Sequence, residues 1–190
     1  CSFHGVPVSA VPVTALGEYH RCPRRYYLGR VLGINEDVFC GPEKQTNIAL
    51  KPGLTGAQRG SAVHRLIESS LKGEFNLKKI VRDGNLPGLK DITREDRKYI
   101  MRCLENYIRG DYFEGSKKIL SEIPFLYRPD KSIYISGVAD GIGIRDDGAI
   151  IADFKTNYMI KDSLMTSYVH QLKIYALAFN DIFKKPVKKA

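Results

Sequence analysis

Apolar residues recur at spacings of three and four positions along much of the chain, which is the pattern of amphipathic helices. The pattern predicts helical segments over residues 14–34, 58–71, 94–108 and 162–183. Thr14 and Thr93 are the expected N-caps of the first and the third, and Pro23 is expected to start a new helix within the first. Residues 35–56 are polar and interrupted by glycine and proline, so we expect a surface loop there, with a mixed connection at residues 74–91.

Between the third and the fourth helix the apolar period changes to two, which predicts β-strands. The strands are expected over residues 119–127, 133–144 and 149–156, and a hairpin turn within residues 145–148 joins the last two. The order of elements predicts an α+β fold in which helices flank a small mixed sheet with an antiparallel meander. A chain of 190 residues can bury one sizeable core, so we expect a single domain over residues 1–190.

Composition narrows the class of protein. Lys and Arg number 30 against 21 Asp and Glu, and the net charge of +9 favours polyanionic partners, although it also fits an ordinary solvated surface. No apolar run reaches the roughly 18 residues of a membrane-spanning helix, so we expect no membrane partner. The cysteines lie far apart without a C-x-x-C spacing, which argues against disulfides or a zinc site and favours a reducing, cytoplasmic compartment.

The last two predicted strands carry the most informative polar residues. Asp153 and Lys155 are two positions apart, so on a strand their side chains point to one face. A hairpin turn at residues 147–148 would place Asp140 opposite Lys155, whereas a turn at residues 146–147 would place Asp140 opposite Asp153. Either register gathers two carboxylates and a lysine on one surface. Because like charges repel, Mg²⁺ or Mn²⁺ is the expected counter-charge, and a simple Asp–Lys pair at a strand end is the alternative.

Two further pairs stand four positions apart on predicted helices, and each pair therefore shares a helix face. Gly60 allows a close backbone approach beside His64, whose imidazole is either a metal ligand or an ordinary surface or core histidine. Gln171 and Tyr175 are candidates for a functional role or for core packing with a buried polar tip.

Residues 19–30 interleave arginine with tyrosine. This combination suits a single nucleic-acid strand, because arginines bind phosphates and tyrosines stack on bases. The alternative is an amphipathic helix with solvated arginines. The candidate contacts are Arg21, Arg24, Arg25 and Tyr26.

Six motifs follow one another along the chain: Cys22-Pro23-Arg24-Arg25-Tyr26-Tyr27-Leu28, Gly60-x-x-x-His64, Glu122-Ile123-Pro124-Phe125, Gly137-x-x-Asp140, Asp153-Phe154-Lys155-Thr156 and Gln171-x-x-x-Tyr175. In this order they resemble the RecB-type branch of the PD-(D/E)XK nucleases, the nuclease domains of RecB and AddA helicase–nucleases. The resemblance runs from Thr14 to about Phe183 and implies a restriction-endonuclease-like catalytic core over residues 57–183, with residues 14–34 facing DNA and residues 35–56 as a loop.

The resemblance also implies roles for single residues. The metal would be held by His64, Asp140, Asp153 and the backbone carbonyl of Phe154. Lys155 would orient or activate the attacking water and stabilise the charge of the transition state. The remaining implied residues would support these, with Glu122 assisting at the metal and with Gln171 and Tyr175 holding either DNA or the geometry of the site.

The activity implied by the resemblance is a Mg²⁺- or Mn²⁺-dependent deoxyribonuclease, expected as an exonuclease in DNA repair or recombination. The implied partners are DNA, with single-stranded ends expected, and a helicase in the same parent chain or complex, because this chain has no G-x-x-x-x-G-K-[ST] motif. The alternative is a non-catalytic DNA-binding module of the same fold, against which the retained Asp140, Asp153 and Lys155 argue.

Two departures from the family pattern affect these expectations. Some relatives hold an iron–sulfur cluster with one cysteine near the position of Cys22 and three near the C-terminus. Here no cysteine follows Cys103, so the cysteines present do not support such a cluster. The first residue is not methionine, and we expect a nuclease domain excised from a longer chain.

Overall fold

The computed structural model describes residues 9–34, 53–90, 92–131, 133–156 and 162–190. In chain order, its elements are β1 (Ser9–Pro12), α1 (Val13–Arg21), α2 (Pro23–Tyr26), the π-helix η1 (Tyr27–Val31), α3 (Gly56–Leu71), α4 (Leu77–Asp83), α5 (Arg94–Gly110), β2 (Lys118–Asp130), β3 (Ile133–Arg145), β4 (Gly148–Ala152), α6 (Asp162–Phe183) and β5 (Val187–Lys189). Among the described residues, no helix combines the length and apolar character that crossing a membrane requires.

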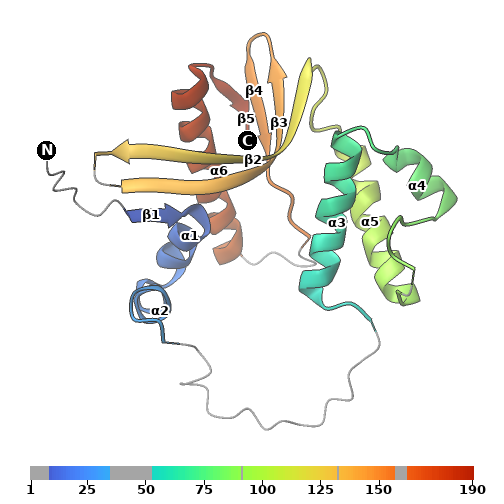
Figure 1. Cartoon of the computed structure of the whole chain (residues 1–190), viewed down its shortest axis with the longest axis horizontal. Helices are drawn as coiled ribbons and strands as arrows, with labels where there is room; N and C mark the ends of the chain where they lie inside the picture. Colours follow the sequence, from blue (N-terminus) through green and yellow to red (C-terminus); the bar gives the residue numbers. More distant parts are fainter. Residues whose placement is uncertain (1–8, 35–52, 91, 132, 157–161) are drawn as a thin grey trace, which may run out of the picture.

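The strands form one mixed sheet that is organised around β3. β2 runs antiparallel along one edge of β3, with pairs from Lys118–Ile144 to Asp130–Ile133. β1 and β4 share the other edge, where β1 is parallel to the start of β3 and β4 is antiparallel to its end. β5 adds to β4 in parallel. Figure 1 shows β2 and β3 as a long bent ribbon with β1 below one end. The predicted α+β class, with a mixed sheet and an antiparallel meander, is confirmed.

The edge of β3 that β1 and β4 share contains a gap. The last pair with β1 is Pro12–Ser136, and the first pair with β4 is Gly141–Ala152. None of the described strands therefore lies beside residues 137–140 on this edge. Because buried backbone groups need hydrogen-bond partners, this stretch must find them outside the sheet.

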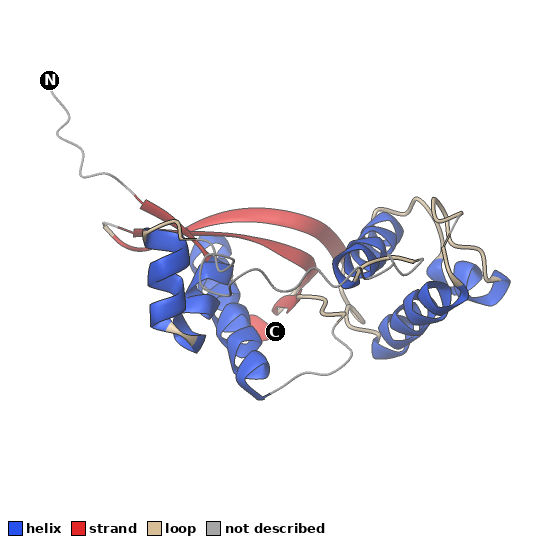
Figure 2. Cartoon of the chain, turned by 90° about the horizontal axis from the view of Figure 1, so that it is seen from below, coloured by secondary structure: helices blue, strands red, loops and turns tan. Residues whose placement is uncertain are grey.

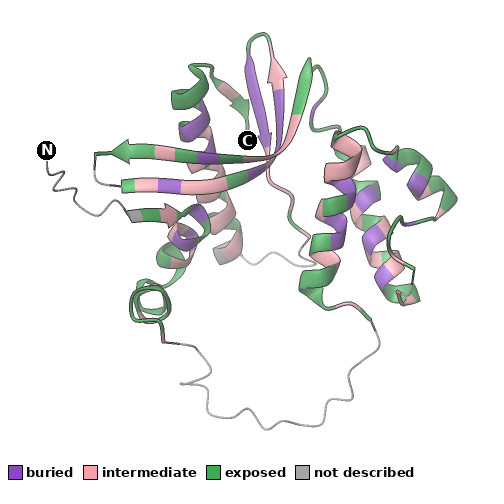
Figure 3. Cartoon of the chain, viewed as in Figure 1, coloured by how far each residue is buried: buried purple, intermediate pink, exposed green. Residues whose placement is uncertain are grey.

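Two clusters of buried side chains hold the elements together, and Figure 3 shows both in purple. The first packs α1 and α6 on the sheet, with a centre made of Phe125, Ile142, Ile151, Tyr175 and Phe179. The second fills the space between α3, α4 and α5 and is built from aliphatic side chains that include Val63, Leu66, Ile67, Ile100 and Leu104. Seen from below in Figure 2, these two bodies lie side by side along the molecule.

A buried carboxylate ties the start of α3 to the start of α5. The Asp96 side chain is fully buried and accepts hydrogen bonds from the Leu54 amide at 2.9 Å, from Arg59 Nε at 2.6 Å and from the Thr93 hydroxyl at 2.7 Å. Thr93 also caps α5 by accepting from the Asp96 amide, as the sequence predicts. These hydrogen bonds, led by that from Thr93, lower the pKa of Asp96 to about 2.

Several predicted boundaries are wrong. Helix α1 begins at Val13 after Pro12, so Thr14 is not its N-cap. The connection over residues 74–91 contains a helix, α4, which Asn76 caps. The return strand β4 ends at Ala152, so the segment from Asp153 to Thr156 is not part of a strand. Of the predicted loop over residues 35–56, residues 35–52 lie outside the described part of the chain.

We expect Asp96→Ala to destabilise the protein strongly, because the change leaves Arg59 and two other donors without their buried acceptor. The loss should be on the order of 3 kcal/mol, or roughly 10 °C in melting temperature. Asp83→Ala on the exposed end of α4 is the control and should change stability by less than about 0.5 kcal/mol.

The stability that the Asp96 carboxylate contributes should depend on pH. A carboxylate with a lowered pKa contributes stability above its ordinary pKa of 3.8, and this contribution disappears as the pH falls toward about 2. The difference in melting temperature between the parent and Asp96→Ala should therefore be constant near neutral pH and shrink below about pH 4. A difference that does not change with pH in this range would contradict the assignment.

Candidate active site

Asp140 lies at the centre of a group of polar side chains, at the end of the gap in β3. The observed hairpin pairs Arg145 with Gly148, which is the register predicted for a turn at residues 146–147. Asp153 follows the last residue of β4 and is thus level with Asp140 across the sheet. On the other edge of β3, Glu122 lies between the pairs Ser121–Gly141 and Ile123–Ala139, level with Asp140 too. Asp140 therefore has an acidic residue beside it on both sides.

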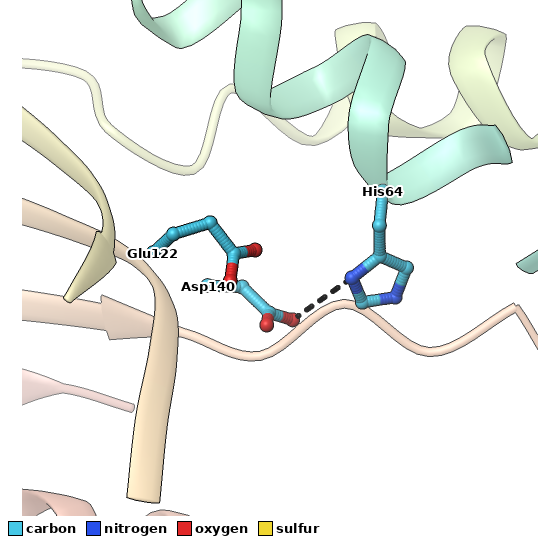
Figure 4. Close-up of side chains that lie close together, drawn as sticks. All are labelled: His64, Glu122 and Asp140. Carbon is cyan, nitrogen blue, oxygen red and sulfur yellow. Dashed lines mark ion pairs between the residues drawn. The ribbon is translucent and has the colours of Figure 1, made fainter. Parts of the chain in front are cut away.

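The backbone of Glu122 departs from the strand around it. Its φ is +50°, a left-handed conformation that L-residues with a Cβ adopt at a cost of about 1–2 kcal/mol. Strain of this kind persists where the surrounding structure imposes it, and it is concentrated at functional sites. The strained residue lies where its side chain extends toward Asp140, as Figure 4 shows.

His64, Glu122 and Asp140 form a cluster that could hold a metal ion. One ligand atom from each lies within 4.8 Å of the others, and His64 Nδ1 is 3.6 Å from Asp140 Oδ2. Figure 4 shows the imidazole reaching down from α3 toward the two carboxylates, which come from β2 and β3. The cluster thus joins the helical body that contains α3 to the sheet.

The electrostatics of this cluster fit a divalent cation. Burial raises the pKa of Asp140, and the neighbouring Asp153 raises it further, while the hydrogen bond from the Phe154 amide opposes the shift. Burial and then the charge of Asp140 raise the pKa of Glu122. Two carboxylates that repel each other provide the hard oxygen donors that Mg²⁺ and Mn²⁺ accept, and the imidazole of His64 adds one nitrogen donor beside them.

The carboxylate of Asp153 lies outside that three-residue group and contacts other side chains. Lys155 Nζ is 2.5 Å from Asp153 Oδ2, and Gln171 Nε2 donates to Asp153 Oδ1 at 3.0 Å. The ammonium group of Lys155 also lies 5.0 Å from the ring centre of Tyr168 on α6. Asp153 is only 6% exposed and Lys155 is 27% exposed, so the lysine extends from a buried partner toward solvent.

A chain of hydrogen bonds runs from Asp153 to the gap in β3. The Gln171 amide nitrogen also donates to the Tyr175 hydroxyl at 2.7 Å, and this hydroxyl donates to the Val138 carbonyl at 2.9 Å. Val138 lies within residues 137–140, so Tyr175 supplies a partner that neither β1 nor β4 provides. Tyr175 is 2% exposed. Its burial favours the second of the two roles predicted for Gln171 and Tyr175, that of holding the geometry of the site.

Gly137 makes this arrangement possible. A Cβ at this position would lie 2.7 Å from the Phe125 ring and 3.2 Å from the Tyr175 ring, so at least the Phe125 ring would have to shift. Phe125 and Tyr175 meet edge to face with ring centres 5.2 Å apart. The glycine of the Gly137-x-x-Asp140 motif is therefore needed so that Tyr175 can reach β3.

The segment after β4 is held from both sides. The Phe154 amide donates to Asp140 Oδ2 at 2.6 Å, and the Phe154 ring packs on the helical core, 5.2 Å from the ring of Tyr107. Gly60 of α3 admits the next part of the segment, because a Cβ there would lie 3.0 Å from the Thr156 hydroxyl. This bears out the close approach predicted for Gly60. With Phe154 packed on the helical core, the side chains of Asp153 and Lys155 contact α6 instead, through Gln171 and Tyr168.

The structure does not bring the arginine-rich segment to this cluster. Arg21, Arg24 and Arg25 are exposed on α1 and α2, and Tyr26 packs against Tyr19 with ring centres 5.5 Å apart. Figures 1 and 2 both place α1 and α2 on the side of α6 that faces away from α3. The role of this segment in binding nucleic acid stays a prediction.

The sequence did not identify two tyrosines that contact residues of the site. Tyr168 stands on the predicted helix over residues 162–183, and nothing in its spacing distinguishes it from a core residue. Tyr99 of α5 hydrogen-bonds to Thr156, and its ring lies beneath the Arg59 guanidinium at 5.6 Å. Its place in the apolar stripe of α5 hides this polar contact, so only the tertiary structure reveals it.

The chain is similar to a nuclease family and to helicase/nuclease subunits. The family model described as the PD-(D/E)XK nuclease superfamily matches residues 10–190. An ATP-dependent helicase/nuclease subunit from Heliobacterium modesticaldum is 30% identical over 162 residues, which cover 71% of this chain and 12% of that protein. The protein of the same name from Thermoanaerobacter sp. is 25% identical over 170 residues, or 73% of this chain and 13% of its own. The chain thus spans about an eighth of the length of these curated relatives.

We expect Mn²⁺ or Mg²⁺ to raise the melting temperature, because an ion that binds only the folded cluster stabilises it. At a hundred times the dissociation constant the gain is about 2.7 kcal/mol, or roughly 5–10 °C. Since the pKa values of Asp140 and Glu122 are raised, protons compete early, and the gain should decline as the pH becomes mildly acidic. Thermal unfolding with metal or with EDTA at several pH values measures this.

Asp140→Asn should remove the metal-dependent shift and raise the melting temperature of the metal-free protein. A carboxylate with a raised pKa costs stability as the pH rises through that pKa, and asparagine carries no charge while its oxygen can still accept from Phe154. Asp147→Asn, at the exposed end of the same hairpin, is the control and should keep the shift. A metal-dependent shift that persists in Asp140→Asn would remove Asp140 from the ligand set.

Proposed function

The chain belongs to the PD-(D/E)XK nuclease superfamily, and on this premise we propose that it is a deoxyribonuclease that depends on Mg²⁺ or Mn²⁺. The observation that carries the proposal is the convergence of His64, Glu122 and Asp140 beside the Asp153–Lys155 pair. A chain that had lost catalysis and retained only a DNA-binding fold would have no reason to keep mutually repelling carboxylates and a lysine at this point.

In the proposed chemistry, the residues of the site have different roles. A bound divalent ion would supply positive charge next to the phosphate that is attacked, and His64, Glu122 and Asp140 would hold it. Lys155 is the proposed catalytic residue, and its ammonium group would orient the attacking water and stabilise the charge that develops on the phosphate oxygens. Asp153 fixes the position of Lys155 by the contact at 2.5 Å and, as a further proposed ligand, would complete the metal site with the Phe154 carbonyl.

Gln171 and Tyr175 are positioning residues in this scheme. Through Gln171 the carboxylate of Asp153 is linked to Tyr175, and through Tyr175 to the backbone two residues before Asp140. The two aspartates therefore share one rigid support. Catalysis requires that groups be held within fractions of an ångström, and a buried hydrogen-bond chain meets that requirement better than solvated side chains do.

We further propose that the substrate is DNA with a single-stranded end, cleaved exonucleolytically in repair or recombination together with a helicase. The support is the name of the relatives, helicase/nuclease subunits that are much longer than this chain, and the net charge of +9. The test compares linear and circular single-stranded DNA of the same sequence in the presence of Mn²⁺. An exonuclease degrades only the linear form, and cleavage of the circle would assign an endonuclease instead.

We expect Lys155→Ala to reduce the cleavage of linear single-stranded DNA at least about a hundredfold, because the lysine acts mainly on the transition state. DNA binding in EDTA should stay close to that of the parent, since one exposed charge contributes little to the affinity. Lys184→Ala, at the exposed end of α6, is the control for the loss of one positive charge. Unchanged melting temperatures would establish that both variants fold, and parent-like cleavage by Lys155→Ala would contradict the mechanism.

Binding of single-stranded DNA should weaken as salt rises, by about 0.7 log unit per log unit of salt for each neutralised phosphate. If the exposed arginines on α2 contact DNA, Arg24→Ala combined with Arg25→Ala should lower this slope by roughly one to two. The measurement is fluorescence anisotropy of a labelled oligonucleotide over a range of salt concentrations in EDTA. A parent slope near zero would argue against nucleic acid as the ligand.

A further inference from the structure

A groove of about 840 Å³ opens beside the proposed catalytic lysine, on the side of α5. One wall is formed by β4 and the segment from Asp153 to Thr156, and the opposite wall is formed by α5 with parts of α3. Lys155 and Asp153 line this groove, whereas His64, Glu122 and Asp140 are not among its lining residues. The groove therefore lies beside the lysine, between β4 and the helical body, and the three residues of the metal cluster do not line it.

The wall formed by α5 carries a polar stripe. Lys98, Arg102 and Asn106 are each four positions apart, so they follow one face of the helix, and all three are exposed and line the groove. The acidic lining residues are Glu95, at the first turn of α5, and Asp153, which is already in contact with Lys155. Basic groups therefore predominate on the surface that a ligand would meet.

Aromatic rings lie between these polar side chains. Tyr99, Tyr107 and Tyr112 also line the groove. Burial raises the pKa of Tyr107 to about 12, so its hydroxyl stays neutral at physiological pH. The rings of Tyr107 and Tyr112 are 5.9 Å apart and tilted by 32°, and both contact the Phe154 ring. Alternating cations and aromatic rings are the surface that binds single-stranded nucleic acid, whose unpaired bases stack while its phosphates meet lysine and arginine.

On the premise of the nuclease function proposed above, we propose that this groove binds one single strand of nucleic acid on one side of the phosphate that is cleaved. Lys98 and Arg102 bind successive phosphates, and the exposed ring of Tyr112 accepts an unpaired base. A strand with a phosphate at Lys155 continues into the groove without a turn, because both are parts of one cavity. The exposed arginines of α1 and α2 lie on the other side of α6 and form a separate surface.

The test is the variant in which Lys98→Ala is combined with Arg102→Ala. Its matched control combines Lys79→Ala with Arg82→Ala, which removes the same two residue types from the exposed face of α4 outside the groove. Binding of a labelled oligonucleotide, as a single strand and as a duplex, is measured in EDTA across a range of salt. Cleavage of the bound single strand is measured separately with Mn²⁺ under single-turnover conditions and saturating protein.

We expect the groove variant to bind the single strand several-fold more weakly and to lower the salt slope by about 1.4, which corresponds to two lost phosphate contacts. The α4 control should change neither quantity, and both variants should keep the melting temperature of the parent because the altered side chains are exposed. Because the two residues bind the strand rather than the reacting phosphate, the groove variant should lose more in affinity than in the single-turnover rate at saturation.

Other results would overturn the inference. A groove variant that matches the α4 control shows that no strand is bound there, and an equal loss for duplex and single strand shows that the site is not specific for single strands. Failure of the parent to cleave any DNA with Mn²⁺ would instead contradict the proposed function. The binding measurements in EDTA remain decisive for the groove in that case, so the two failures are distinguishable.

Discussion

The site depends on an interruption in the pairing of β3. β1 leaves this strand at Ser136 and β4 joins it at Gly141, so none of the described strands pairs with the residues between them on that edge. A gap of this kind would leave buried backbone groups without partners, and Tyr175 compensates by donating to the Val138 carbonyl. The gap ends at Asp140, the residue on which His64 and Glu122 converge. The interrupted pairing and the candidate site therefore meet at one residue.

The segment that follows β4 joins the two hydrophobic cores. Its aromatic residue, Phe154, packs on the helical core, while its amide binds Asp140 on the sheet. Because Phe154 is fixed in both ways, Asp153 and Lys155 are both directed toward α6 even though they lie beyond the end of the strand. The alternation expected of a strand thus survives in a segment outside the sheet, and packing rather than sheet pairing maintains it.

Asp96, which is fully buried, and Asp140, which is partly buried, show how the same residue type serves stability or chemistry. Asp96 accepts hydrogen bonds from three separate donors, and its pKa is lowered to about 2, so its charge stabilises the fold. Asp140 has a raised pKa because burial and the nearby Asp153 outweigh its hydrogen bond from the Phe154 amide. The first carboxylate is neutralised by the protein itself, whereas the second still needs a cation. This difference is the physical argument for a metal centre at Asp140 and against one at Asp96.

The sequence by itself determined the features that depend on local period and spacing. The helix over residues 162–183 and the start of α5 after Thr93 follow from their apolar stripes and cap, and the spacing of Asp153 and Lys155 is enough to place them together. It did not reveal β1, β5 or the end of β4 at Ala152, because the position of a short strand depends on partners far away in the chain. It did not reveal the short helix α4 either. The contacts of Asp153 with Gln171 and Lys155, and the groove along α5, were likewise decided only by the tertiary structure. A residue's spacing fixes which neighbours share its face, but only the packing of distant segments fixes what that face meets.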